Sequence, residues 1–254
     1  EAALGEQDPA DAAPRHYLLA RARLLLGNPG LGLEEIRKAL ALEEESGHKA
    51  YGTPLVEGQA LLQLGRYEEA MASFREALAR ADAGERPHVL HEMGVAALDH
   101  GAYPEAEEHL RALVREEGYP YLAQAYADLA EALYRQGRYQ EAEAAAREAV
   151  ARGAVAAGEL VLGHVAYDLL HLEEALEHYR KAAESAEEGS REWVGAQEMV
   201  VDTLAQLGYR FPEEMVRRGQ AVLPYLHPAD EWHAALTAYV ERAQALLREG
   251  KRLN

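Results

Sequence analysis

The chain has 254 residues, and 26 Lys and Arg against 44 Asp and Glu give it a formal charge of −18 at pH 7. This excess of negative charge disfavours nucleic acids and anionic membranes as partners, because both are bound through clustered basic residues. The absence of cysteine excludes disulfides, thiolate metal ligands and cysteine nucleophiles. The sequence contains no apolar stretch long enough to span a bilayer, and its start does not resemble an intact signal peptide. We expect a cytoplasmic protein, and the missing initiator Met leaves a removed leader or further segment open.

Alanine and leucine, both strong helix formers, dominate the sequence and predict an all-α fold. The first predicted elements are two helices, Arg15–Leu26 and Leu31–Glu44, joined by a turn at Gly27–Gly30. Thr53, which precedes a proline at the start of the next predicted helix, is a candidate N-cap.

A short pattern then repeats along the chain. It reads Gly-x-Tyr-x-Glu-Ala at 65–70, 101–106 and 137–142, and a weaker copy without the glycine covers 170–175. The final Ala recurs at intervals of 36, 36 and 33 residues. Each copy follows a predicted helix with a small residue in its middle; these small residues are Gly58, Gly94, Ala130 and Gly163.

The pattern predicts a pair of antiparallel helices in each repeat. Glycine ends the first helix because it adopts positive φ without steric cost, and the tyrosine begins the second. The small mid-helix residues let the two backbones approach closely, so we expect them to be buried between the paired helices. One pair cannot bury its apolar face alone, and successive pairs should therefore stack.

These residues resemble the tetratricopeptide repeat, whose period is about 34 residues. The resemblance implies a right-handed superhelical solenoid of about six helix pairs plus a C-terminal capping helix. Clear repeats cover about 52–188, and degenerate copies cover about 13–46 and 192–224. We align the flanking copies through Ala39 and Ala221, and we expect the capping helix at about 229–250. Because no low-complexity linker interrupts the chain, residues 1–254 are predicted to form a single solenoid.

Candidate catalytic and metal-binding groups have simpler explanations. The acidic pairs at 34–35, 68–69, 173–174 and 213–214 are predicted to lie in the first turn of second helices, where the helix dipole favours negative charge. His88 and His91 could share a helical face and ligate a metal, but no third ligand is evident. We find no nucleophile motif, and we expect no catalysis, no cofactor and no metal site.

The remaining candidate is a groove lined by the first helices of successive repeats, as the resemblance implies for protein- or peptide-binding scaffolds. Positions three and four apart on the face turned away from the paired helix should line it. The predicted groove residues are Tyr17, Arg21, Gln59, His88, His91, Gln124, Glu131, Tyr134, His164 and Tyr167.

The predicted partner is a protein or peptide with basic and apolar character. Residues 151–200 alone carry 4 basic and 10 acidic residues, so a negative field should surround this part of the groove. Glu131, flanked by Tyr134 and Tyr167, is predicted to hold a basic side chain, with His91 and His164 beside it. Two alternatives remain: a structural protein that self-associates through its terminal repeats, and a His-dependent metal-binding regulator or enzyme.

Overall fold

The computed structural model describes residues 9–252, with side chains described from residue 12 to residue 250. These residues form thirteen α-helices and one short 3-10 helix, and no strand occurs among them. The described residues divide into two compact units at the boundary between Tyr119 and Pro120. The prediction of an all-α repeat fold is confirmed, whereas the prediction of one continuous solenoid stays a prediction.

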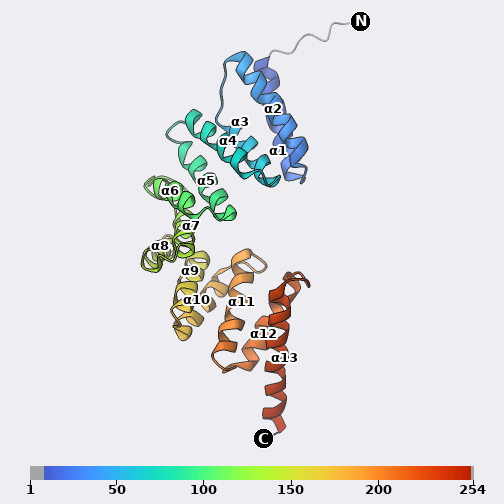
Figure 1. The fold of residues 1–254 in the computed structure, drawn as a ribbon, viewed down its shortest axis with the longest axis vertical. Helices are drawn as coiled ribbons and strands as arrows, with labels where there is room; N and C mark the ends of the chain where they lie inside the picture. Colours follow the sequence, from blue (N-terminus) through green and yellow to red (C-terminus); the bar gives the residue numbers. More distant parts are fainter. Residues whose placement is uncertain (1–8, 253–254) are drawn as a thin grey trace. The chain divides into compact units, whose positions relative to one another are not determined.

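The first unit contains three antiparallel helix pairs (Figure 1). Its helices are α1 (Pro9–Leu25), α2 (Pro29–Ser46), α3 (Gly52–Gln63), α4 (Tyr67–Arg80), α5 (Arg86–His100) and α6 (Tyr103–Leu113). The second helix of one pair packs on the first helix of the next, so α2 contacts α3 and α4 contacts α5. Each first helix after α1 is thus covered on both sides.

The second unit continues the same arrangement with three further pairs and a last helix. Its elements are α7 (Leu122–Arg135), α8 (Tyr139–Arg152), α9 (Val155–Asp168), α10 (Leu172–Ser185), α11 (Arg191–Gln206), α12 (Pro212–Val222), the 3-10 turn η1 (Leu223–Tyr225) and α13 (Glu231–Arg252). The first helices α7, α9 and α11 contact one another in order, and α13 extends the row. No helix in the described part of the chain is both long and apolar enough to cross a membrane.

The two helices of a pair meet where a small residue faces a larger one sixteen positions later. A Cβ atom on Gly58 would lie 2.3 Å from Phe74 Cε1, one on Gly94 would lie 2.6 Å from Leu110 Cγ, and one on Gly163 would lie 2.5 Å from Tyr179 Cε1. Ala130 and Ala146 have the same spacing, and both are fully buried. This confirms that the small mid-helix residues lie between the paired helices.

The sixth pair departs from the predicted alignment. Ala221 is exposed, whereas Val222 is fully buried and takes the place that Ala182 has in the fifth pair. The small residue of this pair is Gly219 in the second helix, and its space is filled from α13, because a Cβ there would lie 2.3 Å from Val240 Cγ2. The alignment through Ala221 was therefore wrong by one residue.

The turn between α9 and α10, in the fifth pair, keeps the geometry of the other turns without a glycine. Gly65, Gly101 and Gly137 adopt φ of 71°, 82° and 72°, and Leu170 adopts 62° at the equivalent place. His171 then occupies the position that precedes α10. A left-handed conformation costs a non-glycine residue roughly 1–2 kcal/mol, so this turn is held in place by the helices on either side of it.

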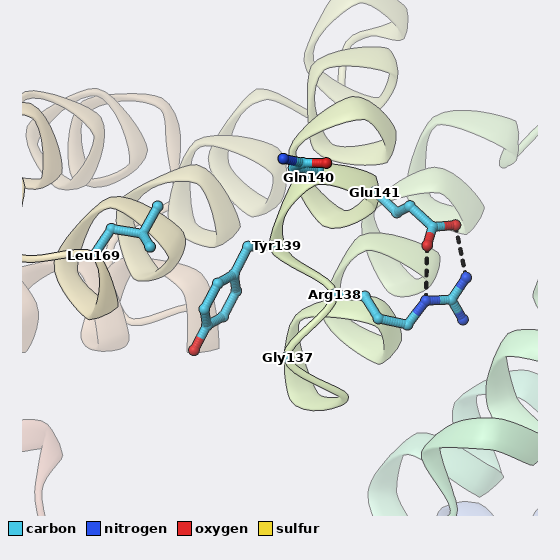
Figure 2. Close-up of a pocket in the computed structure, with 6 residues that line it drawn as sticks. All are labelled: Gly137, Arg138, Tyr139, Gln140, Glu141 and Leu169. Carbon is cyan, nitrogen blue, oxygen red and sulfur yellow. Dashed lines mark hydrogen bonds and ion pairs between the residues drawn. The ribbon is translucent and has the colours of Figure 1, made fainter.

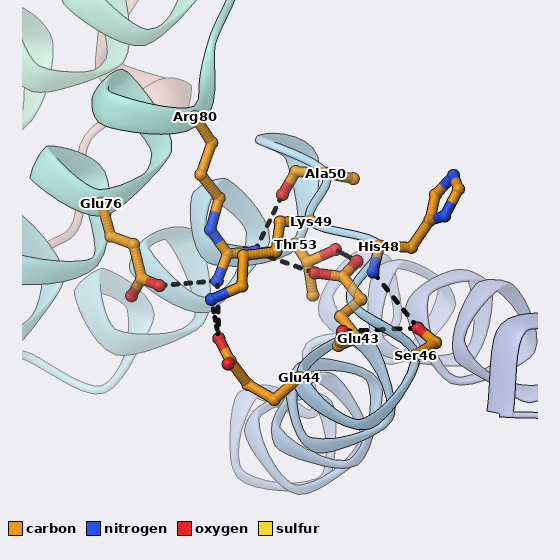
Figure 3. A network of polar contacts seen from close by, with 9 residues as sticks. All are labelled: Glu43, Glu44, Ser46, His48, Lys49, Ala50, Thr53, Glu76 and Arg80. Atoms are coloured by element: carbon orange, nitrogen blue, oxygen red, sulfur yellow. Dashed lines mark hydrogen bonds and ion pairs between the residues drawn. The ribbon is translucent and has the colours of Figure 1, made fainter.

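A buried ion network closes the loop between α2 and α3 (Figure 3). The Arg80 side chain, 8% exposed, donates to Glu43 at 2.8 Å, to Glu76 at 2.6 Å and to the Ala50 carbonyl at 3.1 Å. The hydroxyl of Thr53 donates to the Glu43 carboxylate from within α3. Thr53 was expected to be an N-cap, but its side chain serves this network instead.

Three of the four acidic pairs lie in the first turn of a second helix, as predicted, and one does not. Those at 68–69, 173–174 and 213–214 lie in the first turns of α4, α10 and α12, as predicted. The pair Glu34–Glu35 lies further along α2, whose first turn has no acid. Glu35 is buried and hydrogen-bonded to Lys38 and His16, and these contacts lower the pKa of its carboxyl group.

Candidate functional surface

The predicted groove residues of α1 and α3 do not form one cluster: Tyr17 and Gln59 are half-buried, whereas Arg21 is exposed. The hydroxyl of Tyr17 packs beside Gly52 at the start of α3. A Cβ atom on Gly52 would lie 3.3 Å from the Tyr17 hydroxyl oxygen. The guanidinium of Arg21 lies 5.8 Å from the centre of the Tyr17 ring, within range of a cation–π interaction. Gln59 is half-buried in α3, and its side chain belongs to no polar cluster of the described residues.

His88 and His91 share a helical face, but their common neighbour is a tyrosine. Both imidazoles meet the Tyr119 ring edge-on, with ring centres 5.2 Å and 5.5 Å apart. The Nδ1 atom of His91 lies 2.8 Å from the Tyr119 hydroxyl. Among the described residues no group of three or more His, Cys, Asp or Glu could hold a metal ion. These histidines therefore anchor the segment that ends the first unit.

In the second unit the predicted residues of α7 and α9 come together. The rings of Tyr134 and His164 stack with centres 5.5 Å apart, and His164 Nδ1 lies 2.9 Å from the hydroxyl of Tyr179 in α10. Burial lowers the pKa of His164, so the imidazole is neutral at pH 7.

The same row of rings continues across α9, α11 and α13. The hydroxyl of Tyr167 donates to Asp202, at 2.5 Å, and the charge of this carboxylate also acts on Tyr239 in α13. Asp202 is 5% exposed. Burial and the neighbouring carboxylate raise the pKa of both tyrosines, which therefore stay protonated as donors. No Lys or Arg of the described chain forms an ion pair with Asp202.

A second carboxylate, Asp168, sits at the exposed edge of this row. It accepts a hydrogen bond of 3.1 Å from Tyr139 at the start of α8, and burial together with the charge of Asp168 raises the pKa of Tyr134. Figure 2 shows the Tyr139 ring standing between Leu169 and the turn at Gly137, where the surface forms an open pocket. Within residues 9–252, no cation is paired with Asp168.

Glu131 and Gln124 each have a polar partner on their own helix. The Glu131 carboxylate is paired with Arg135 at 2.7 Å, one helical turn further along α7, so its charge is already offset. Gln124 donates to Asp128 at 2.9 Å on the same helix. The carboxylates that face the rings without a basic partner among the described residues are Asp168 and Asp202 instead.

We call the set formed by Tyr134, Tyr139, His164, Tyr167, Asp168 and Asp202 the aromatic–acidic surface. Sequence reasoning placed three of its rings on the first helices but did not assign a role to either aspartate or to Tyr139. The sequence did contain a feature that could have pointed to Asp168 and Tyr139. Asp168 directly follows Tyr167 at the end of a first helix, and Tyr139 is the repeat tyrosine of the neighbouring second helix.

Antiparallel helix pairs stacked in sequence, with a small residue of one helix facing the other, define a helical repeat protein. Tetratricopeptide repeat families match residues 56–83 and 91–157. Residues 56–83 and 91–157 accordingly carry tetratricopeptide repeats, and the other helix pairs of the described chain continue the same fold. No curated protein sequence matches it.

Solved structures with the same fold include bacterial proteins. PilF of Pseudomonas aeruginosa superposes with a TM-score of 0.69 at 16% identity, over 91% of this chain and 98% of that one. PilW, described as a type IV pilus biogenesis factor, gives 0.66 at 16% identity, over 89% and 98%. MamA of Desulfovibrio magneticus gives 0.59 at 22% identity, over 69% and 95%. At these identities the likeness concerns the fold alone.

Proposed function

We propose that the protein is a non-catalytic scaffold whose second unit binds a protein or peptide segment with basic and apolar side chains. The observation that carries this proposal is the aromatic–acidic surface. Neighbouring first helices there bear tyrosine and histidine rings beside two carboxylates to which the described chain supplies no basic partner. Protein binding is the general role of tetratricopeptide repeats, and the chemistry of the ligand follows from these residues.

Each part of the surface favours such a ligand. Tyr139 and Tyr167 donate hydrogen bonds to Asp168 and Asp202, and these neutral donors add no positive charge beside the carboxylates. The hydroxyl of Tyr139 contacts Asp168, and an Arg or Lys side chain placed over the Tyr139 ring gains about 0.5–2 kcal/mol. The net charge of −18 adds a field that speeds the approach of basic segments. Leu169 beside the pocket offers apolar contact.

The test is selection of random 12-residue peptides displayed on phage, followed by titration of the selected peptides against the purified chain. We expect enrichment of Arg or Lys next to apolar residues. Asp168→Asn should weaken a selected peptide at least fivefold at low salt and less at high salt. Glu177→Gln is the control, because it removes the same charge from an exposed site on α10. Equal losses in the two variants, or enrichment of acidic peptides, would contradict the proposal.

A further inference from the structure

The outer face of α1 carries an apolar stripe that no part of the described chain covers. Ala13, Ala20 and Leu24 are buried against α2 and α3. On the opposite side, four leucines are 47–86% exposed; they are Leu18, Leu19, Leu25 and Leu26. Ala22 is exposed and lies three or four positions from each of these leucines. Residues at that spacing share a helical face, so the four leucines form one continuous stripe around Ala22.

The stripe is flanked by positive charge in a strongly acidic protein. Residues 12–33 include Arg15, Arg21 and Arg23 and no Asp or Glu, whereas the whole chain carries −18. Arg15 and Arg21 are exposed, and within residues 12–250 neither forms an ion pair. A surface with this composition attracts apolar groups bordered by carboxylates and repels basic segments.

The repeat architecture indicates what shape would fit. The first helices α3, α9 and α11 are each covered by the second helix of the preceding pair, namely α2, α8 and α10. α1 is also a first helix, and its face bears the leucines that such a contact would bury. An α-helix lying against α1 would therefore reproduce a packing that the chain already uses repeatedly.

We propose that the outer face of α1 binds an acidic amphipathic helix of a partner protein. Leucines 18, 19, 25 and 26 pack against the apolar face of that helix, and Arg15 and Arg21 pair with its flanking carboxylates. This surface is distinct from the aromatic–acidic surface of the second unit, and the two prefer partners of opposite charge.

The proposal is tested with a displayed library of 18-residue helix-forming peptides, randomised along one face and its flanks and selected on the full chain. We expect enrichment of apolar residues at spacings of three and four, bordered by Asp or Glu. The double variant Leu18→Ser/Leu25→Ser should bind a selected peptide at least tenfold more weakly. Leu64→Ser, an exposed leucine at the end of α3, is the matched control and should lose less than twofold.

Charge is tested separately. Arg15→Gln/Arg21→Gln should weaken the selected peptide at least threefold and reduce its salt dependence, and Asp168→Asn should leave it unchanged. Failure to enrich, enrichment of basic flanks, or equal losses in Leu64→Ser and the double variant would overturn the proposal. Circular dichroism of each variant confirms that it is folded.

Two other occupants have distinct signatures, and either would overturn the proposal. Sedimentation velocity that shows a concentration-dependent dimer, lost in Leu18→Ser/Leu25→Ser, would assign the face to a second copy of this chain. Co-sedimentation with phosphatidylcholine–phosphatidylglycerol vesicles, lost in the same variant, would assign it to a membrane. We expect a monomer that stays in the supernatant, since an acidic chain is repelled by other copies and by anionic lipid.

Discussion

Gly163 provides the space that the ring of Tyr179 occupies, since a Cβ atom at position 163 would lie 2.5 Å from Tyr179 Cε1. Tyr179 is fully buried, and its ring cannot withdraw without disturbing the core of the second unit. The same relationship holds at the same spacing between Gly58 and Phe74 and between Gly94 and Leu110. It sets the distance between the two helices in these three pairs.

Gly163→Ala should therefore destabilise the protein although alanine favours helix. We expect a loss of about 1–3 kcal/mol in the free energy of unfolding, measured by urea denaturation, because the new methyl group overpacks the contact. Gly195→Ala in α11 is the control, since its Cβ would meet Leu160 at an ordinary 3.8 Å. That variant should gain about 0.5–1 kcal/mol from helix propensity alone. Equal effects would show that the Gly163 contact is not tight.

Leu170→Gly should stabilise the protein. Leu170 is 79% exposed and has φ of 62°, so glycine relieves an unfavourable backbone conformation while removing little buried apolar surface. We expect a gain of about 1 kcal/mol in the free energy of unfolding. Gly137→Ala, at the equivalent turn with φ of 72°, should lose a similar amount. A stability loss in Leu170→Gly would mean that the leucine side chain holds the turn by packing.

Arg80→Met should cost about 3 kcal/mol, because it leaves the buried Glu43 carboxylate without its cation. Arg147 serves as the comparison: its side chain is 66% exposed and it pairs with Glu143 at 3.4 Å one turn away. Arg147→Met should change stability by less than about 0.5 kcal/mol. Thermal denaturation of both variants in the same buffer measures the difference, and comparable shifts in Tm would refute a structural role for the Arg80 network.

Acidification should destabilise the second unit through His164. Burial holds the pKa of His164 below the value of about 6.5 expected in the unfolded chain. As the pH falls below that value the unfolded chain takes up a proton that the folded chain does not, so the free energy of unfolding decreases. His164→Gln should flatten this decrease in urea denaturation between pH 7.5 and pH 5. Parallel curves for variant and wild type would contradict the assignment.

The repeat register could be predicted from sequence because it depends on local features. Glycine at a turn, tyrosine at the start of a helix and a small residue in mid-helix recur within about 36 residues, and their roles follow from backbone geometry. The sixth pair could not be aligned correctly, since the space beside Gly219 is filled by Val240, a residue outside the repeats. Nothing in the local sequence of α12 records that contact.

The surface was predictable only in part. Helical spacing placed Tyr134, His164 and Tyr167 on first helices, but the partner of each ring depends on how neighbouring helices are rotated. The charge balance at Glu131 likewise depends on whether Arg135 turns toward it or away. Sequence alone therefore located the rings, but it could not show that Tyr139 and Tyr167 donate to Asp168 and Asp202.

The size match between facing helices also constrains how the repeats can diverge. Gly163 with Tyr179 and Ala130 with Ala146 are two solutions of one packing problem. Converting the first into the second requires two substitutions, and their order matters. Shrinking the tyrosine first leaves a cavity, whereas enlarging the glycine first creates a clash, so each route passes through a weakened intermediate. Lineages are expected to exchange the two positions together, and a chimera that joins helices from different repeats should fold only when the two facing residues fill the contact without a clash.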